Sequence, residues 1–406
     1  MNKGERERAS SRAPRREAIA AGGEPVSPVK LCAVRILVVL TQPPLPEGGA
    51  PGRCALGLLR GLVGHGFDVH ALAARQSFSV PGEPPEDLPV DVVTIPPEEA
   101  GRGRLERLRR PGGELARGIF LERVREAARE SDVVHLEETE TAWCDLGVER
   151  PSLVHLHYLV RRDRTLGLPV TRDARHALEL ALAERAAIRR HRFLVASSPL
   201  VADGLRKASP RAEVVVAPLS LDPELYEAAP LDGPAVAGII GTATWPPTAA
   251  AMLRLGTEVW PEIRRRVPEA SLAVAGRGTA SLPGLEDGTG IELAGEVGSA
   301  REFLRGLSVL VFPLERGSGM KVKVLEAMAS GLPVVTTPAG AEGVLRNDGV
   351  VVETDPRRLA AAAASILRDA GERKERGAAA LRAFEERHTP EPATRPLAEL
   401  YRRIAS

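Results

Sequence analysis

The segment Phe312–Val335 has the residue types and spacing needed to bind a diphosphate. A short apolar run at 308–312 leads into Gly317-Ser318-Gly319, and a helical pattern follows until Gly331. Glycines ahead of a helix let backbone N–H groups approach a phosphate, and the helix N-terminus adds partial positive charge. The sequence therefore predicts a strand, glycine turn, helix and strand that could hold phosphate.

Charged side chains lie at the start of this expected helix. Lysine is rare in this arginine-rich chain, yet Lys321 and Lys323 fall beside the glycine turn. Lysine acts on phosphate as a compact point charge. Glu326 lies one turn further on and could accept hydrogen bonds from a ligand. Solvated lysines on an ordinary crossover helix are the alternative.

The segment resembles the donor-site motif of glycosyltransferase family 4, a large group of retaining enzymes with the GT-B fold. Weaker matches elsewhere follow the family's order, so the resemblance covers roughly 34–384. It implies a nucleotide diphosphate sugar as co-substrate and no metal or other cofactor, and the chain has no Asp-x-Asp motif. The matching donor-site residues are Gly317, Ser318, Gly319, Lys323, Leu325–Ala329, Gly331 and Pro333–Val335.

The resemblance implies roles for several of these donor-site residues. Glu326 would accept hydrogen bonds from the donor ribose, and Lys321 and Lys323 would neutralise its diphosphate. Relatives often place an arginine and a lysine around the loop 241–252, but this chain has neither, so Arg277 becomes a third candidate. Ser318 occupies the position where relatives carry a glutamate that contacts the transferred sugar.

Two loops of the first half complete the expected site. Gly48 and Gly49 would lie near the acceptor and the donor diphosphate. His157 follows the strand at 153–156 and would contact the transferred sugar, so we assign it, with Ser318, to the catalytic residues. Alternation along the strand places His155 on the same face but deeper in the sheet. His135 has a similar strand-end setting, and hydrogen-bonded structural roles are the alternative for all three histidines.

Another loop matches the family only in part. Pro218 and Asp222 agree with its pattern, whereas Leu219 and Ser220 depart from it. We therefore expect an ordinary connection at this position.

Strands alternate with helical patterns along the whole chain, which predicts an α/β protein with doubly wound parallel sheets. We expect a disordered tail at 1–31 and two Rossmann-like domains of a GT-B fold at 32–228 and 235–387. The final helix, in 388–406, would cross back onto the first domain as it does in GT-B relatives. The expected strands are 34–40, 67–72, 90–95, 132–136, 153–156, 193–196, 213–217, 235–240, 271–275, 290–293, 308–312, 333–336 and 349–352. A single long helix is expected at 247–266.

Bulk properties exclude some classes of function. A net charge of +1 and an aromatic content of 3% argue against a nucleic-acid binder. Three scattered cysteines do not form a disulfide framework, and neither a membrane-spanning run nor a secretory h-region is present. We therefore expect a cytoplasmic protein, with peripheral membrane contact open through arginine clusters such as Arg102–Arg110.

The sequence leads to a retaining, hexosyltransferase-like enzyme with an unknown acceptor: a glycan, a lipid-linked sugar or a small-molecule natural product. Two alternatives remain. One is a non-catalytic GT-B binding or activator protein, and the other is a GT-B nucleotide-sugar epimerase. Nucleotide release from a panel of donor sugars would distinguish the three.

Overall fold

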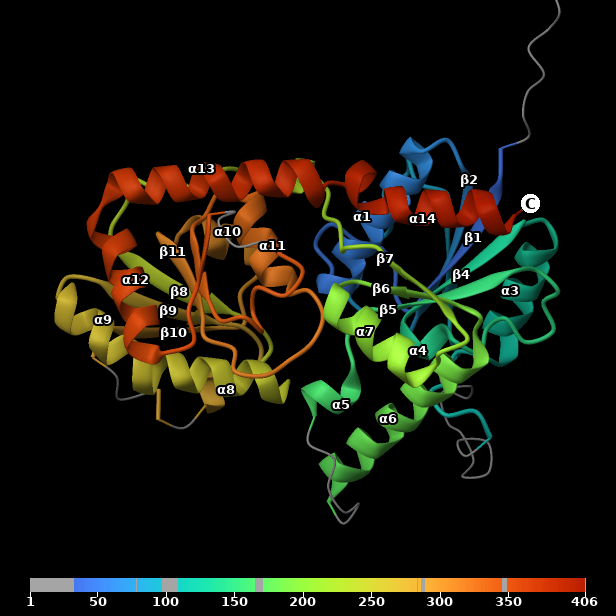
Figure 1. Ribbon diagram of the computed structural model, residues 1–406, viewed down its shortest axis with the longest axis horizontal. Helices are drawn as coiled ribbons and strands as arrows, with labels where there is room; N and C mark the ends of the chain where they lie inside the picture. Colours follow the sequence, from blue (N-terminus) through green and yellow to red (C-terminus); the bar gives the residue numbers. More distant parts are fainter. Residues whose placement is uncertain are drawn as a thin grey trace, which may run out of the picture. The chain divides into compact units, whose positions relative to one another are not determined.

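The computed structural model describes residues 33–77, 79–96, 109–164, 171–282, 284–285, 289–344 and 349–405. The expected tail, Cys32 and most of Arg102–Arg110 lie outside these residues. Val34–Ser406 form one unit, and within it two parallel sheets have helices on both faces (Figure 1). This is the expected α/β architecture.

The N-terminal half contains a seven-stranded sheet in the order β3-β2-β1-β4-β5-β6-β7. All neighbouring strands in it are parallel. Its strands are β1 (Arg35–Leu40), β2 (Asp68–Arg75), β3 (Val90–Thr94), β4 (Val133–Glu137), β5 (Ser152–Leu156), β6 (Phe193–Ala196) and β7 (Glu213–Val216). Its helices are α1 (Ala50–Gly64), α3 (Gly118–Arg129), α4 (Glu138–Thr141), α5 (Val160–Asp163), α6 (Arg172–Arg190) and α7 (Pro199–Ala208).

The C-terminal half contains a six-stranded parallel sheet in the order β10-β9-β8-β11-β12-β13. Its strands are β8 (Val236–Ile240), β9 (Ser271–Ala275), β10 (Ile291–Gly295), β11 (Val309–Phe312), β12 (Val334–Thr336) and β13 (Val350–Val352). Its helices are α8 (Pro246–Arg254), α9 (Trp260–Arg266), α10 (Ala300–Arg305), α11 (Val322–Ala329), α12 (Pro356–Arg368) and α13 (Ala370–Arg387), and the last helix of the chain is α14 (Pro390–Ile404).

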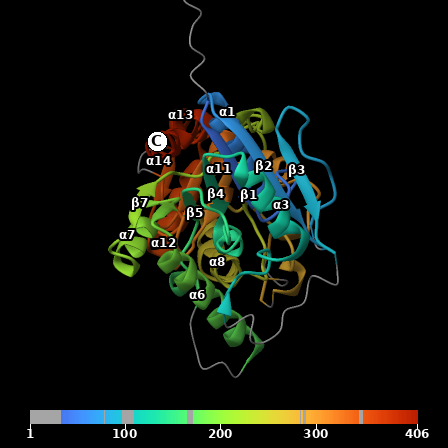
Figure 2. The same ribbon diagram turned by 90° about the vertical axis from the view of Figure 1, so that its right-hand side faces the viewer.

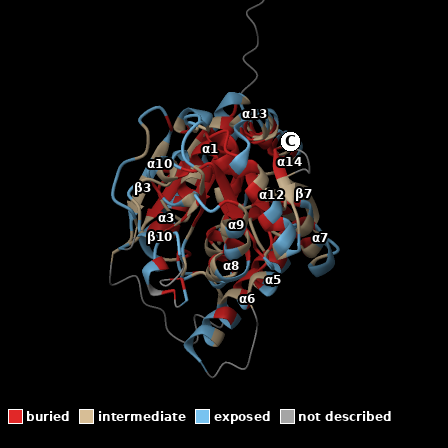
Figure 3. Ribbon diagram, turned by 90° about the vertical axis from the view of Figure 1, so that its left-hand side faces the viewer, coloured by how far each residue is buried: buried red, intermediate tan, exposed pale blue. Residues whose placement is uncertain are grey.

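The strands form where the sequence has short apolar runs, and the central strands are buried on both faces. Val309–Phe312 and Ile36–Leu40 are buried at every position. Helices cover both faces of a parallel sheet, so its strands need no polar side. Figure 3 shows the buried residues gathered in the centre and the exposed ones on outer helices and loops. The strand positions expected from the sequence are confirmed to within a few residues.

One expected helix differs from its pattern. The run 247–266 predicts a single helix, but a π-helical segment, Leu255–Val259, separates α8 from α9. Pro261 in the first turn of α9 has no N–H to donate into the preceding turn. Gly256 lies in this segment with Leu285 packed against it, so a Cβ at Gly256 would lie 2.1 Å from the Leu285 side chain.

The last helix belongs to the core of the N-terminal half. α14 packs against α1 (Figures 1 and 2), and Leu397 and Tyr401 are buried in one cluster with residues of β1 and α1. The approach is close, because a Cβ on Gly61 of α1 would lie 2.4 Å from the Pro390 carbonyl oxygen. Among the described residues, no helix is long and apolar enough to cross a membrane.

Candidate active site

The two sheets each have a point where the strand order reverses, between β1 and β4 and between β8 and β11. Ligands of open α/β sheets bind in the crevice beyond the carboxyl ends of the strands at such points. The donor-motif turn follows β11, the Gly48–Gly49 loop follows β1, and His157 follows β5, next to β4. The fold therefore collects the expected site residues at these sheet edges.

The glycine turn after β11 contacts the N-terminal half directly. Gly319 has a left-handed backbone, with φ at 73°, and a Cβ there would lie 1.8 Å from the carbonyl oxygen of His157. Only glycine fits this position. The donor turn and His157 are thus in contact.

Lys323 is a partly buried cation in the first turn of α11. Its Nζ atom lies 3.5 Å from the Thr248 hydroxyl and 4.4 Å from the centre of the Phe312 ring. It also lies against Gly241, where an added Cβ would be 2.9 Å from Nζ. Burial, together with the nearby Lys321, lowers the pKa of Lys323 to about 8, and Glu326 only partly opposes this. Within the described part of the chain, Lys323 has no ion-pair partner.

Lys321 is the residue that precedes α11, and its ammonium group turns back onto the glycine turn. It donates to the carbonyl oxygen of Ser318 at 3.0 Å and also to that of Gly319. Burial lowers the pKa of Lys321, while Glu342 and Asp163 act in the opposite direction. Lys321 therefore supports the shape of the turn.

Glu326 is buried and already has partners. Its Oε1 atom lies 2.6 Å from a guanidinium nitrogen of Arg53 and accepts a hydrogen bond from the Tyr226 hydroxyl at 3.1 Å. Arg53 belongs to α1 and also donates to the carbonyl oxygen of Gly48. The expected ribose acceptor is therefore fixed by residues from the other half of the molecule and from the connection between the halves.

Ser318 joins the two halves. Its hydroxyl accepts a hydrogen bond from the Leu159 N–H at 2.7 Å and donates to Asp163 Oδ1 at 2.5 Å. The Ser318 N–H donates to the same carboxylate oxygen at 2.8 Å. The side chain that sequence reasoning assigned to the transferred sugar thus contacts α5, and it places the carboxylate of Asp163 beside the turn.

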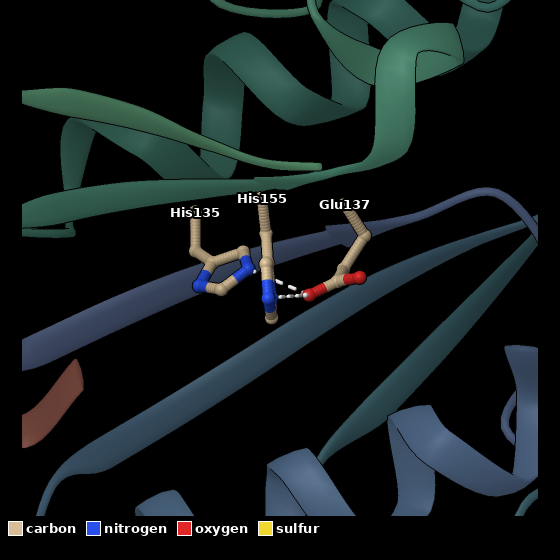
Figure 4. A group of neighbouring side chains, drawn as sticks. All are labelled: His135, Glu137 and His155. Carbon is tan, nitrogen blue, oxygen red and sulfur yellow. Dashed lines mark hydrogen bonds and ion pairs between the residues drawn. The ribbon is translucent and has the colours of Figure 1, made fainter. Parts of the chain in front are cut away.

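A carboxylate–histidine network lies at the ends of β4 and β5 (Figure 4). Glu137 Oε1 accepts hydrogen bonds from His135 Nε2 at 2.7 Å and from His155 Nδ1 at 3.0 Å. His157 Nε2 lies 2.8 Å from the other oxygen, Oε2. His135 also contacts the Tyr401 hydroxyl of α14 through its Nδ1 atom. One buried carboxylate therefore orients all three histidines.

The members of this network have pKa values that are shifted in different directions. Burial favours the neutral form of Glu137, but His155, His157 and His135 outweigh it and hold the pKa of Glu137 well below its usual range. Burial also opposes the charged form of His157, yet Glu137 and Glu138 raise its pKa to about 9. Burial lowers the pKa of His155 to about 4. At neutral pH, His157 is therefore an imidazolium and His155 is neutral.

Three side chains of this network have the atom types of a metal site. Ligand-type atoms of His135, Glu137 and His155 lie within 4.8 Å of one another. Both histidines, however, use the atoms in question to hydrogen-bond Glu137, at separations that are short for two ligands of one zinc ion. The arrangement is that of a hydrogen-bonded network.

The other expected site residues lie around this centre. Gly49 is the residue that caps α1. Arg277 pairs with Glu296 at 3.1 Å, and both side chains are more than 60% exposed. Asp222, in the loop expected to be an ordinary connection, accepts hydrogen bonds from the Glu224 N–H and from Arg60, which is a structural use. A cavity of about 640 Å³ adjoins Gly317 and is lined by residues of both halves.

Sequence reasoning missed five polar side chains at this centre. Glu137 and Glu138 could have been found, because two carboxylates directly follow an apolar strand that ends at the expected crevice. The other three, Arg53, Tyr226 and Asp163, lie in segments with no motif of their own.

Two family descriptions match the chain in sequence. Residues 49–220 match the glycosyl transferase 4-like domain, and residues 234–369 match the glycosyl transferases group 1. Among curated proteins, no significant sequence match is found.

Solved structures of similar fold cover nearly the whole chain. Sucrose-phosphate synthase from Thermosynechococcus elongatus is 17% identical, with a TM-score of 0.66 over 91% of this chain and 99% of its own. Anabaena HepE in complex with UDP-glucose is 16% identical, with a TM-score of 0.62 over 91% of this chain and 100% of its own. Trehalose 6-phosphate synthase from Burkholderia multivorans is 14% identical, with a TM-score of 0.59 over 92% and 97%.

Proposed function

Because this chain belongs to the group 1, family 4-like glycosyltransferases, we propose that it transfers a sugar from a uridine or guanosine diphosphate sugar to an acceptor hydroxyl. Members of this family retain the anomeric configuration. The complex of HepE with UDP-glucose supports a uridine nucleotide as the first donor to test. The acceptor is a glycan, a lipid-linked sugar or a small molecule, and a lipid-linked acceptor would bring the enzyme to the membrane surface.

The environment of Lys323 is the main support for this proposal. The Lys323 ammonium group is partly withdrawn from water and has no ion-pair partner in the described part of the chain, so an anion bound beside it would stabilise its charge. Lys323 lies at the first turn of α11, at the reversal point between β8 and β11, and against Gly241. A diphosphate at this position would meet both the ammonium group and the helix N-terminus.

The chemistry follows from where charge develops. As the bond between the sugar and the diphosphate breaks, negative charge accumulates on the diphosphate oxygen. Lys323, supported by Lys321, would stabilise that charge. The cationic His157 would orient the transferred sugar, and Glu326 would hold the ribose through the oxygen that Arg53 and Tyr226 do not use. Departure and attack on the same face of the sugar would give retention.

Ser318 would act through the residue that it positions. Relatives carry a carboxylate where this chain has Ser318, but here Ser318 holds the carboxylate of Asp163 at 2.5 Å. Asp163 would therefore supply the negative group beside the donor turn. We propose Gly48, Gly49 and Gly317 as close-approach positions of the donor loops, and Arg277 as an outer diphosphate contact.

We also propose the domain division expected from the sequence. The acceptor domain would be 32–228, the donor domain 235–387, and the last segment 388–406 would belong with the first domain, because α14 packs against α1.

A donor panel tests the proposed function. The protein is incubated with several UDP- and GDP-sugars, and release of nucleoside diphosphate is measured together with calorimetric binding of UDP and GDP. One donor should be turned over, and Glu326→Ala should weaken binding of its nucleotide by about 1.5–3 kcal/mol, as expected for a hydrogen bond to a charged group. Binding without any turnover would favour a non-catalytic role, and unchanged affinity in the variant would remove Glu326 from the ribose site.

A further inference from the structure

Glu138 has an unusual backbone. It is the one non-glycine residue in the described part of the chain with a positive φ, at 64°. Such a conformation is uncommon for residues other than glycine, asparagine and aspartate, and it persists where the surroundings enforce it, often at functional sites. Glu138 is the first residue of α4, directly after β4. The chain therefore turns sharply at this residue.

Glu138 lies at the centre of the proposed site. β4 borders β1 at the strand-order reversal of the N-terminal sheet and borders β5 on its other side. Glu138 Oε1 lies 3.7 Å from His157 Nδ1, and the backbone of His157 contacts Gly319 of the donor turn. The Glu138 carboxylate therefore lies beside His157, the residue that contacts the donor turn.

Glu137 and Glu138 are adjacent carboxylates with different surroundings. Three histidines surround Glu137 and keep it ionised. Glu138 faces Glu140 and Glu137 as well as His157, and burial together with the two carboxylates raises the pKa of Glu138 to about 7. Pairs of carboxylates whose environments differ in this way divide into a permanently charged group and a group that exchanges protons. Glu138 is the exchanging member, and 18% of its side chain is exposed.

We propose that Glu138 is the catalytic base that acts on the acceptor, which rests on the glycosyltransferase function proposed above. Its carboxylate takes the proton of the acceptor hydroxyl while that oxygen forms a bond to the anomeric carbon. The bond from this carbon to the diphosphate oxygen breaks, and its electron pair leaves with the diphosphate at Lys323. Glu138 then returns the proton to solvent. The acceptor class is a compound that reacts through a neutral hydroxyl group.

Two variants test this role, Glu138→Gln and Glu138→Gly. Both are assayed with the donor sugar that the wild type turns over fastest in the panel. Glu138→Gln keeps the size of the side chain, and Glu138→Gly suits the left-handed backbone. Transfer to glycerol or water should fall 10²–10⁴-fold in both variants. The affinity for UDP or GDP should stay within twofold, and the melting temperature of the glycine variant should be equal to or above that of wild type.

Adding azide to the two Glu138 variants distinguishes loss of the catalytic base from distortion of the active site. Azide is an anion and needs no deprotonation, so it should restore diphosphate release in both variants and yield a glycosyl azide. Glu126→Gln on α3, an exposed residue, should behave as wild type. Variants that transfer at wild-type rates, or that stay slow with azide, would overturn the role of Glu138. A wild type that binds no nucleoside diphosphate would overturn the proposed function itself and this inference with it.

Discussion

At the scale of single residues, the charge state of His157 decides how it can act. An imidazolium can donate hydrogen bonds to sugar hydroxyls or to a departing phosphate, but it cannot serve as a base. Glu137 and Glu138 produce this state by raising the pKa of His157 to about 9. Sequence spacing placed His157 at the crevice, but it could not show this carboxylate environment.

The pKa of His157 can be measured by NMR titration of its ring protons. We expect a value near 9 in the wild type and a value at least one unit lower in Glu137→Gln, because the closest carboxylate is then neutral. The folded pKa exceeds the ordinary 6.5, so the stabilisation is complete below pH 6.5 and disappears as the pH rises through 9. The melting temperature should therefore fall over this interval, and less so in the variant. A wild-type pKa at or below 6.5 would contradict the network.

Lys323 should make nucleotide binding depend on pH. Its pKa is about 8 in the free protein, and a bound diphosphate would raise it. UDP affinity should then be level below pH 8 and fall as the pH rises above it. Lys323→Arg should remove this fall, because arginine stays charged. Calorimetry from pH 6.5 to 9.5 measures both proteins, and parallel curves would show that Lys323 does not face the diphosphate.

The sequence predicted part of this site for a physical reason. Lys323 and Glu326 lie three residues apart on one helix, so a local pattern is enough to place them on the same face. Arg53, Tyr226 and Asp163 reach the site from other elements, and only the tertiary structure brings them together. Ser318 was expected at the sugar but hydrogen-bonds Asp163, because α5 lies against the donor turn.

At the scale of elements, the donor turn depends on one glycine. Gly319→Ala would place a Cβ 1.8 Å from the His157 carbonyl oxygen and would also strain a φ of 73°. We expect the turn to move away from His157, with at least a tenfold loss of transfer and a lower melting temperature. Gly64→Ala is the matched control, because that glycine ends α1 with open space around it. Equal behaviour of the two variants would mean that the turn and His157 do not need this contact.

The strands were predictable because each one coincides with a short apolar run of the sequence. Ile36–Leu40, for example, are all buried in the core. The π-helical segment was not, because the apolar pattern runs through it without a break, and the contact between Gly256 and Leu285 joins segments that are distant in sequence. Element positions thus follow local patterns, whereas irregularities within elements follow tertiary contacts.

At the scale of the whole molecule, the two halves meet through the residues of the site. Arg53 pairs with Glu326, Ser318 with Asp163, and the rings of Tyr158 and Trp245 make an edge-to-face contact at 5.8 Å. A donor bound beside Lys323 would therefore be surrounded by groups from both sheets, which would exclude water from the reacting centre.

The last helix of the chain, α14, packs on the N-terminal half, although it follows the C-terminal half in sequence. Leu397 of α14 is 1% exposed and packs with β1 and α1. Leu397→Ala should lower the free energy of unfolding by about 2–5 kcal/mol through loss of buried surface and the cavity left behind. Glu399→Ala, on the exposed face of the same helix, should change it by less than about 0.5 kcal/mol. Denaturant titration compares them, and equal stabilities would contradict the packing of α14.

Calorimetric titration of wild type and Lys323→Met with UDP and with uridine shows whether Lys323 holds the diphosphate of a nucleotide sugar. We expect the wild type to bind UDP and the methionine variant to lose at least tenfold in affinity for UDP but less than twofold for uridine. An equal loss for both ligands, or wild-type affinity for UDP in the variant, would contradict this role of Lys323.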